Sequence, residues 1–274
     1  MNKQLFKTLP LLAFLFLLAC NAPKVAQESD GPLKTVEQTR RDAHRNATST
    51  ETDSNDKDES DDNDNASTET PTSTTETSTN DEEFTEKSVG EMGEKPAYMQ
   101  ADEFAMIAEV NLLRADPKGY IKYVEEYIQQ VEKDERFDAA YRAEEVVTAK
   151  ELIGELKKLD KLSLLQPHEG LYQVGQKHGK DVQQQGMIGH RGSDGTMPWD
   201  RVRNNTDLKN GNENLVGGGE SVREQVMILL VDSGISMRGH RKTLLDPSWT
   251  HVACHKIGKV GQVDNSWIQM FGSE

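Results

Sequence analysis

Apolar residues recur every three or four positions along much of the chain after residue 100, which is the spacing of helices with one buried face. The pattern runs through residues 103–113, 120–131 and 149–159, and each stretch is predicted to form a helix. A fourth helix is predicted to open at residue 167 and to continue to residue 182, with one apolar side. These segments indicate a domain rich in amphipathic helices.

The pattern changes toward the end of the chain. Ser221 and Glu224 are spaced as a capping box, and the helix they begin is apolar through Leu230, so it should be buried. Residues 251–260 and 266–271 alternate as two strands joined by a short turn. Helices first and strands late favour an α+β or layered α/β/α domain over a regular βαβ repeat.

The first 19 residues are predicted to be an export signal. Lys3 and Lys7 precede an apolar run that is too short to span a bilayer but suits a signal peptide. The run ends Leu17-Leu18-Ala19-Cys20, which resembles the bacterial lipobox, where the cysteine becomes the lipidated N-terminus. The alternative is an ordinary secretory signal followed by an incidental cysteine. We expect lipid on Cys20 to anchor an exported chain to a bacterial membrane, on the cell surface or facing the periplasm.

Residues 20–95 are predicted to be a disordered tether. They are rich in Ser, Thr, Asp, Glu and Asn, most strongly over 48–86, and cannot bury enough apolar surface to offset the entropy of ordering. An acidic interaction tail is the alternative, but blocks of like charge are more often solvated spacers. Residues 96–274 are long enough for one domain.

Charge and cysteine content narrow the possible partners. The net charge of −15 opposes nucleic-acid binding, which depends on Lys and Arg contacts to phosphate. The chain has two cysteines, so lipid on Cys20 would leave Cys254 without a disulfide partner. Cys254 is therefore expected to be a small buried apolar residue.

Four titratable residues stand in loop-like or helix-end settings and are the candidates for chemistry: His190, Glu213, Asp232 and His240. Two imidazoles with two carboxylates suit Zn²⁺ or a similar divalent cation. The same set without a metal could carry out acid–base work, since histidine titrates near neutral pH. The spacing alone does not show that the four converge.

The motifs around these residues resemble, in the right order, those of the CAP superfamily, also called SCP-like domains, which includes cysteine-rich secretory, antigen-five and pathogenesis-related proteins. The matching segments are Gly189-His190 with Ser193-Asp194-Gly195, Gly211-Asn212-Glu213-Asn214-Leu215, Gly239-His240-Arg241, the early pair Asn111 and Arg114, and Trp267 to Gly272. The match covers residues 104–272. Asp232 departs from the pattern, because many members place a glutamate after a tryptophan near that point.

This resemblance implies a three-layer α-β-α sandwich with a cleft lined by two histidines and two acidic residues, here His190, Glu213, Asp232 and His240. It favours a non-enzymatic binding module for a divalent metal, a small lipid or an envelope component. A metal- or histidine-dependent hydrolase of an envelope or extracellular substrate is the alternative, and no catalytic residue is assigned.

Three residues next to the candidate site residues are also candidates for ligand binding, and two of them have an alternative interpretation. Arg191, Asn214 and Arg241 are candidates to line the ligand cleft. The two arginines could instead form ion pairs with Asp194 and Asp246.

The other histidines and one serine are interpreted structurally. His178 lies on an apolar helical stripe and is predicted to be a hydrogen-bonded core histidine. His251 and His255 are read as ordinary strand residues. Ser193 near His190 does not indicate a serine triad, since adjacent chain positions seldom point at one another.

Overall fold

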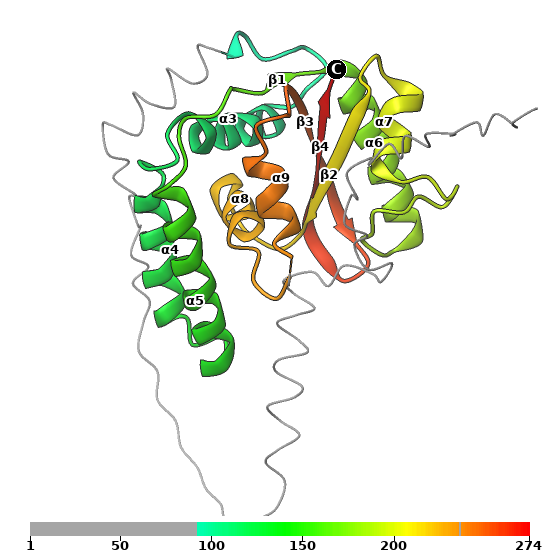
Figure 1. Cartoon of the computed structure of the whole chain (residues 1–274). Helices are drawn as coiled ribbons and strands as arrows, with labels where there is room; N and C mark the ends of the chain where they lie inside the picture. Colours follow the sequence, from blue (N-terminus) through cyan, green and yellow to red (C-terminus); the bar gives the residue numbers. More distant parts are fainter. Residues whose placement is uncertain (1–91, 236) are drawn as a thin grey trace, which may run out of the picture. The chain divides into compact units, whose positions relative to one another are not determined.

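A four-stranded sheet forms the middle layer of the computed structural model, which describes residues 92–235 and 237–274 (Figure 1). The strand order is β1-β3-β4-β2; β1 pairs with β3 in parallel, and the other pairs are antiparallel. The strands are β1 (Gln166–Pro167), β2 (Asn210–Val216), β3 (His251–Val260) and β4 (Val263–Ser273). The predicted signal peptide, Cys20 and nearly all of the predicted tether lie outside the described residues.

Helices cover both faces of the sheet (Figure 1). On one face lie α6 (Glu169–Gln185) and α7 (Pro198–Asn205), and on the other lie α3 (Ala101–Ala115), α8 (Val222–Val231) and α9 (Gly239–Leu245). Two glycines let α6 pack closely against the sheet. A Cβ on Gly179 would press on Ile257, and a Cβ on Gly175 would press on Met270. The predicted three-layer α-β-α arrangement is confirmed.

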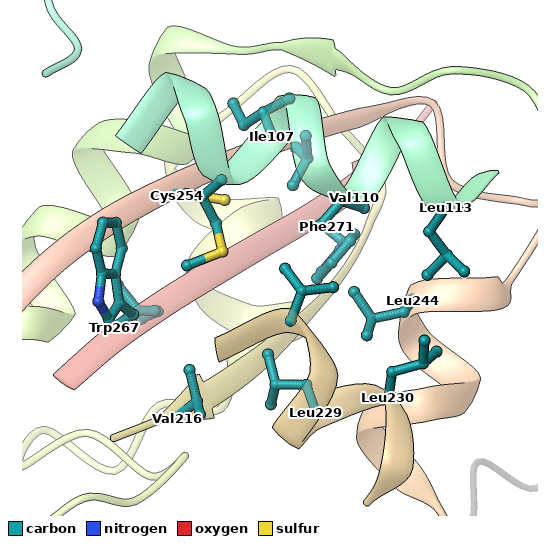
Figure 2. Close-up of a cluster of buried hydrophobic side chains, with 14 of the residues drawn as sticks. Ile107, Val110, Leu113, Val216, Leu229, Leu230, Leu244, Cys254, Trp267 and Phe271 are labelled. Carbon is teal, nitrogen blue, oxygen red and sulfur yellow. The ribbon is translucent and has the colours of Figure 1, made fainter. Parts of the chain in front are cut away.

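An apolar core lies between the sheet and the α3, α8 and α9 layer (Figure 2). Full burial of each large apolar side chain contributes about 1.5–3 kcal/mol to the stability of the folded state. Cys254 on β3 is in this core with no exposed surface and no disulfide partner, so the prediction of a small buried apolar residue is confirmed. Burial raises the pKa of its thiol well above the ordinary value. The core side chains that Figure 2 labels from helices are Ile107, Val110, Leu113, Leu229, Leu230 and Leu244.

A helical hairpin leaves this sandwich and returns to it. It consists of α4 (Ile121–Lys133) and α5 (Ala139–Leu156). The backbone N–H of Leu162 donates to the carbonyl oxygen of Arg114 at 2.8 Å, so the chain comes back to the point where it left α3. The two ends of the segment that contains the hairpin therefore lie side by side.

Most predicted elements are present, with shifted ends. α3, α4, α6 and α8 match the predicted helices, and β3 has the predicted bounds. α5 begins at Ala139 instead of residue 149, because Asp138 caps its N-terminus by accepting from the Tyr141 N–H at 2.8 Å. Its first turns are mostly exposed and show no apolar spacing.

The elements that sequence reasoning missed are all short: β1, β2, α7 and α9. The most consequential is β2, because it places Glu213 in a strand and not in a loop. Within the described residues, no helix has the length and apolar character needed to span a bilayer.

Candidate functional site

The first half of the candidate site is a histidine–glutamate pair. His190 lies in the loop between α6 and α7, and its Nδ1 is 2.8 Å from Oε1 of Glu213 on β2. The Glu213 side chain is fully buried. An ionised carboxylate only accepts hydrogen bonds, so Nδ1 of His190 carries the proton that is donated to Glu213.

An arginine completes this half of the site. Arg201 on α7 donates to Oε2 of Glu213 at 2.7 Å and to the carbonyl oxygen of His190 at 2.9 Å. Burial by itself would raise the pKa of Glu213, but the charge of Arg201 and the hydrogen bond from His190 lower it to about 2. Glu213 is therefore ionised across the neutral range and holds both the imidazole and its loop.

His178 on α6 lies behind this pair. Its side chain is buried, and Nε2 is 3.0 Å from the carbonyl oxygen of Gly189, so the prediction of a hydrogen-bonded core histidine is confirmed. Nε2 also lies 3.6 Å from Oε1 of Glu213, a proximity that the sequence did not reveal. Burial lowers the pKa of His178, although Glu213 opposes this effect. His178 is thus a neutral support for the loop that carries His190.

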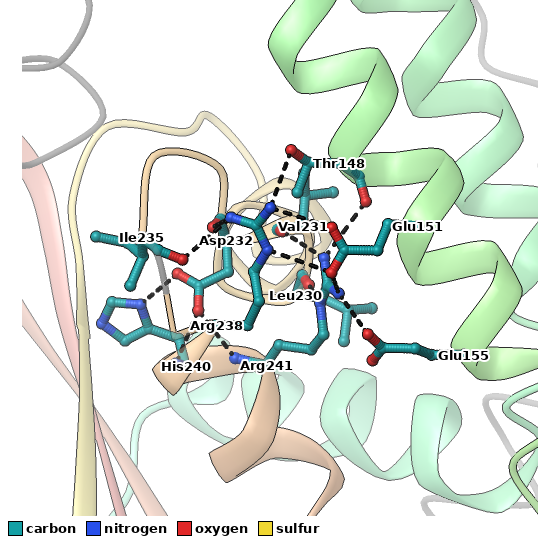
Figure 3. Close-up of polar contacts among 10 residues, drawn as sticks. All are labelled: Thr148, Glu151, Glu155, Leu230, Val231, Asp232, Ile235, Arg238, His240 and Arg241. Carbon is teal, nitrogen blue, oxygen red and sulfur yellow. Dashed lines mark hydrogen bonds and ion pairs between the residues drawn. The ribbon is translucent and has the colours of Figure 1, made fainter. Parts of the chain in front are cut away.

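The second half of the site is a histidine–aspartate pair (Figure 3). Nδ1 of His240 is 2.7 Å from Oδ1 of Asp232, and the backbone N–H groups of His240 and Arg241 donate to Oδ2 at 2.9 Å and 3.3 Å. Asp232 ends α8 in a left-handed conformation with φ 55°, and its carboxylate reaches the start of α9. One side chain therefore both orients the imidazole and satisfies N–H groups of the following helix.

The two halves meet at their imidazoles. The rings of His190 and His240 have centroids 6.5 Å apart and planes inclined by 41°. Each ring turns Nδ1 to its own carboxylate, so the structure brings together the four predicted residues as two pairs. Nε2 of His240 is buried and has no hydrogen-bond partner among the described residues. Across residues 92–235 and 237–274, no three His, Cys, Asp or Glu side chains form a group arranged to hold a metal ion.

Residues 107–271 match the profile of the CAP family, described as the cysteine-rich secretory protein family. This match spans more than half of the chain. The chain belongs to the CAP family. No curated protein sequence matches it.

Two solved structures are similar to this CAP domain. One is an extracellular protein containing an SCP domain from Bacillus anthracis, with 20% identity, a TM-score of 0.34, and coverage of 41% of this chain and 35% of that chain. The other is an outer surface protein of Borrelia burgdorferi, with 20% identity, a TM-score of 0.36, and coverage of 47% of this chain and 90% of that chain. The chain thus spans only about a third of the length of the Bacillus anthracis protein.

The early motif of the CAP domain has a structural role here. Asn111 is fully buried, and its side-chain amide bonds both the N–H and the carbonyl oxygen of Leu165 at 2.8 Å and 2.9 Å. Arg114 is also fully buried and donates to the carbonyl oxygens of Leu244 and Asp246 at the end of α9. Arg114 therefore fixes the C-terminal end of the helix whose N-terminal turn carries His240.

The predicted cleft-lining residues fall in different places. Asn214 is buried, and its amide donates to the carbonyl oxygen of His240 at 3.4 Å and to Gln269 at 3.2 Å. Arg191 is exposed. Arg241 points away from the His240 ring, and its guanidinium is buried against the C-terminal end of α8 (Figure 3). Its carboxylate partners are residues of α5 and not the predicted Asp246.

Arg201 is the site residue that sequence reasoning missed. Pro198 gives the signal that could have found it, because proline favours the first turn of a helix and would have marked the start of α7. The structure also explains the glycine of the segment Gly211-Asn212-Glu213-Asn214-Leu215. A Cβ on Gly211 would collide with the Val202 side chain, so only glycine lets α7 lie close enough for Arg201 to reach Glu213.

Proposed function

We propose that this chain is an exported, lipid-anchored CAP-domain binding module in which His190 and His240 take a divalent cation, most naturally Zn²⁺. The observation that carries the proposal is the buried, unpartnered Nε2 of His240 beside the His190 ring. A buried polar atom without a partner is costly, so a ligand that bonded this nitrogen would remove that cost.

The donor set fits Zn²⁺ in a specific way. Neutral imidazole nitrogen is a preferred Zn²⁺ ligand, and ligating histidines usually donate their other N–H to a carboxylate. Glu213 and Asp232 would be those carboxylate supports, and the Nε2 atoms of His190 and His240 would be the ligands. Two protein ligands leave coordination positions for water or for an oxygen of a bound envelope component.

The test is calorimetric titration of the full chain with Zn²⁺ at pH 7.5. We expect binding at one site, and we expect His190→Ala and His240→Ala each to weaken it at least about tenfold. His251→Ala is the matched control, because its ring lies on β3 and bonds Thr250. His178 would be a poor control, since it lies against Glu213.

Two results would decide against the cation. Absence of Zn²⁺ binding to the wild-type chain would leave the residues as a hydrogen-bonded cluster. Equal losses in His251→Ala and His240→Ala would place binding elsewhere. Ligation requires neutral imidazole and competes with protons, so affinity should also fall on acidification.

Anchoring is a separate part of the proposal and rests on Leu17-Leu18-Ala19-Cys20. The variant Cys20→Ser should move the chain from the membrane fraction to the soluble exported fraction. Complete retention of this variant in membranes would contradict the lipid anchor.

A further inference from the structure

Two arginines join α5, the second helix of the hairpin, to the connection between α8 and α9 (Figure 3). Arg241 donates to the carbonyl oxygens of Leu230 at 2.9 Å and Val231 at 2.8 Å. Arg238 donates to those of Asp232 at 2.9 Å and Ile235 at 3.0 Å. The guanidinium groups therefore satisfy the carbonyls at the end of α8, where no further helical turn is present to do so.

This connection is a strained segment. Asp232 and Arg238 both have left-handed backbone conformations, with φ 55° and φ 50°, although neither is a glycine. Such a conformation is energetically unfavourable and persists only where surrounding contacts fix it. The contacts made by Arg238 and Arg241 supply that constraint, and the same connection places the Asp232 carboxylate against His240.

Glu151 on α5 is the residue that holds both arginines. Its Oε1 is 2.8 Å from Nη1 of Arg241, and its Oε2 is 3.1 Å from Nη2 of Arg238. Glu155 contacts Arg241 alone, at 2.9 Å. Hydrogen bonds from Arg238 and Arg241 lower the pKa of Glu151 against the opposing effect of burial, with the contribution of Arg238 the largest among the favourable causes.

Glu151 is partly exposed, with 44% of its side-chain surface accessible, and an exposed ion pair contributes little to stability. Arg241 is different, because its side chain is 1% exposed and a buried cation requires its partners. The contribution of Glu151 is therefore to alignment: it fixes the direction in which two guanidinium groups hold the chain on either side of Asp232.

We propose that Glu151 is a positioning residue for His240. It acts through Arg238 and Arg241, which hold the α8–α9 connection so that Asp232 faces Nδ1 of the imidazole. The inference deepens the proposed function, because it assigns the control of one cation ligand to the α4–α5 hairpin. Loss of Glu151 should release His240 from its single tautomer while His190, held by Glu213, keeps its own.

The test is ¹H–¹⁵N NMR of the histidine side chains in the full chain, without added metal, at pH 8, where ordinary histidines are neutral. In the wild-type chain, His240 should show the Nδ1–H tautomer. In Glu151→Ala, its two ring nitrogens should shift toward the averaged values of a mixed tautomer. Glu144→Ala removes an exposed glutamate from the same helix and should leave the His240 signals unchanged.

Two outcomes would overturn the proposal. One is an unchanged His240 pattern in Glu151→Ala, whether or not the melting temperature falls, since a purely structural role would lower stability alone. The other is an equal shift of the His190 signals, which would show a general disturbance. Glu151→Gln keeps the side-chain volume and serves if the alanine variant does not fold. The measurement uses no Zn²⁺, so its result does not depend on whether the chain binds a cation.

Discussion

The buried Glu213 carboxylate should make the stability of the domain depend on pH in a way that one variant can isolate. Glu213 is ionised in the folded state with a pKa of about 2, against an ordinary value of 4.5. In the unfolded chain the carboxyl group takes up a proton first as the pH falls. The stability from this group is therefore complete above pH 4.5 and is lost as the pH falls toward 2.

The size of the effect follows from these two values. A difference between 4.5 and about 2 corresponds to roughly 3 kcal/mol, since each pH unit is worth about 1.4 kcal/mol. About 2 kcal/mol of this should be lost by pH 3. Glu213→Gln cannot titrate, and it also leaves Arg201 with a neutral partner in a buried place. The variant should be less stable than the wild-type chain at pH 7 by about 3–5 kcal/mol.

The assay is denaturant unfolding of both proteins at several pH values from 7 to 3. The titrating groups away from this cluster are shared, so the difference in unfolding free energy between the two proteins reports Glu213 together with its effect on the neighbouring His178. We expect that difference to shrink by about 2 kcal/mol between pH 6 and pH 3. Glu126→Gln, at an exposed position on α4, should give a small difference that does not change with pH. A constant difference between wild type and Glu213→Gln would refute the argument that Arg201 and His190 hold the carboxylate ionised.

Three further substitutions test the packing around the site. Gly211→Ala should destabilise the domain by about 1–3 kcal/mol in thermal unfolding, because its Cβ collides with Val202; an unchanged melting temperature would contradict the close contact of α7 and β2. Asn111→Ala should cost about 2–4 kcal/mol in denaturant unfolding, since the N–H and carbonyl groups of Leu165 lose their partner. Cys254→Ser should cost about 1–3 kcal/mol, because it buries a hydroxyl group in the core, and a neutral effect would mean that water reaches this side chain.

Long apolar patterns predicted the layers of this fold, but the short helices and strands show no such pattern and were not predicted. α3, α6 and β3 each bury one face over several turns or residues, so the periodicity of their apolar residues is visible in the sequence. β2 has seven residues, and its first half is polar and not fully buried, so its alternation is too weak to detect. α9 has seven residues and begins after an arginine in a left-handed conformation, which no propensity rule favours.

The candidate site was partly predictable for a related reason. His190, Glu213 and His240 stand out because histidines and acids beside glycine-rich motifs are chemically unusual. Their pairing did not follow from the sequence, because the hydrogen bonds join residues 23 positions apart in one pair and 8 in the other. Arg201 was missed because an arginine on a polar helix is ordinary until the fold places a buried carboxylate beneath it.

The place of β4 in the sheet has a consequence for how the domain is made. β4 is the last strand along the described chain, yet it lies between β3 and β2, and Met270 is the residue opposite Glu213. A ribosome delivers residues in order, at about 5–20 per second, so both histidines and both carboxylates emerge before the strand that brings β2 into the sheet. A nascent chain halted before residue 263 would contain every side chain of the site without the scaffold that aligns them. The site should therefore form only after β4 has been synthesised, and termination before β4 should leave a protease-sensitive product without the assembled site.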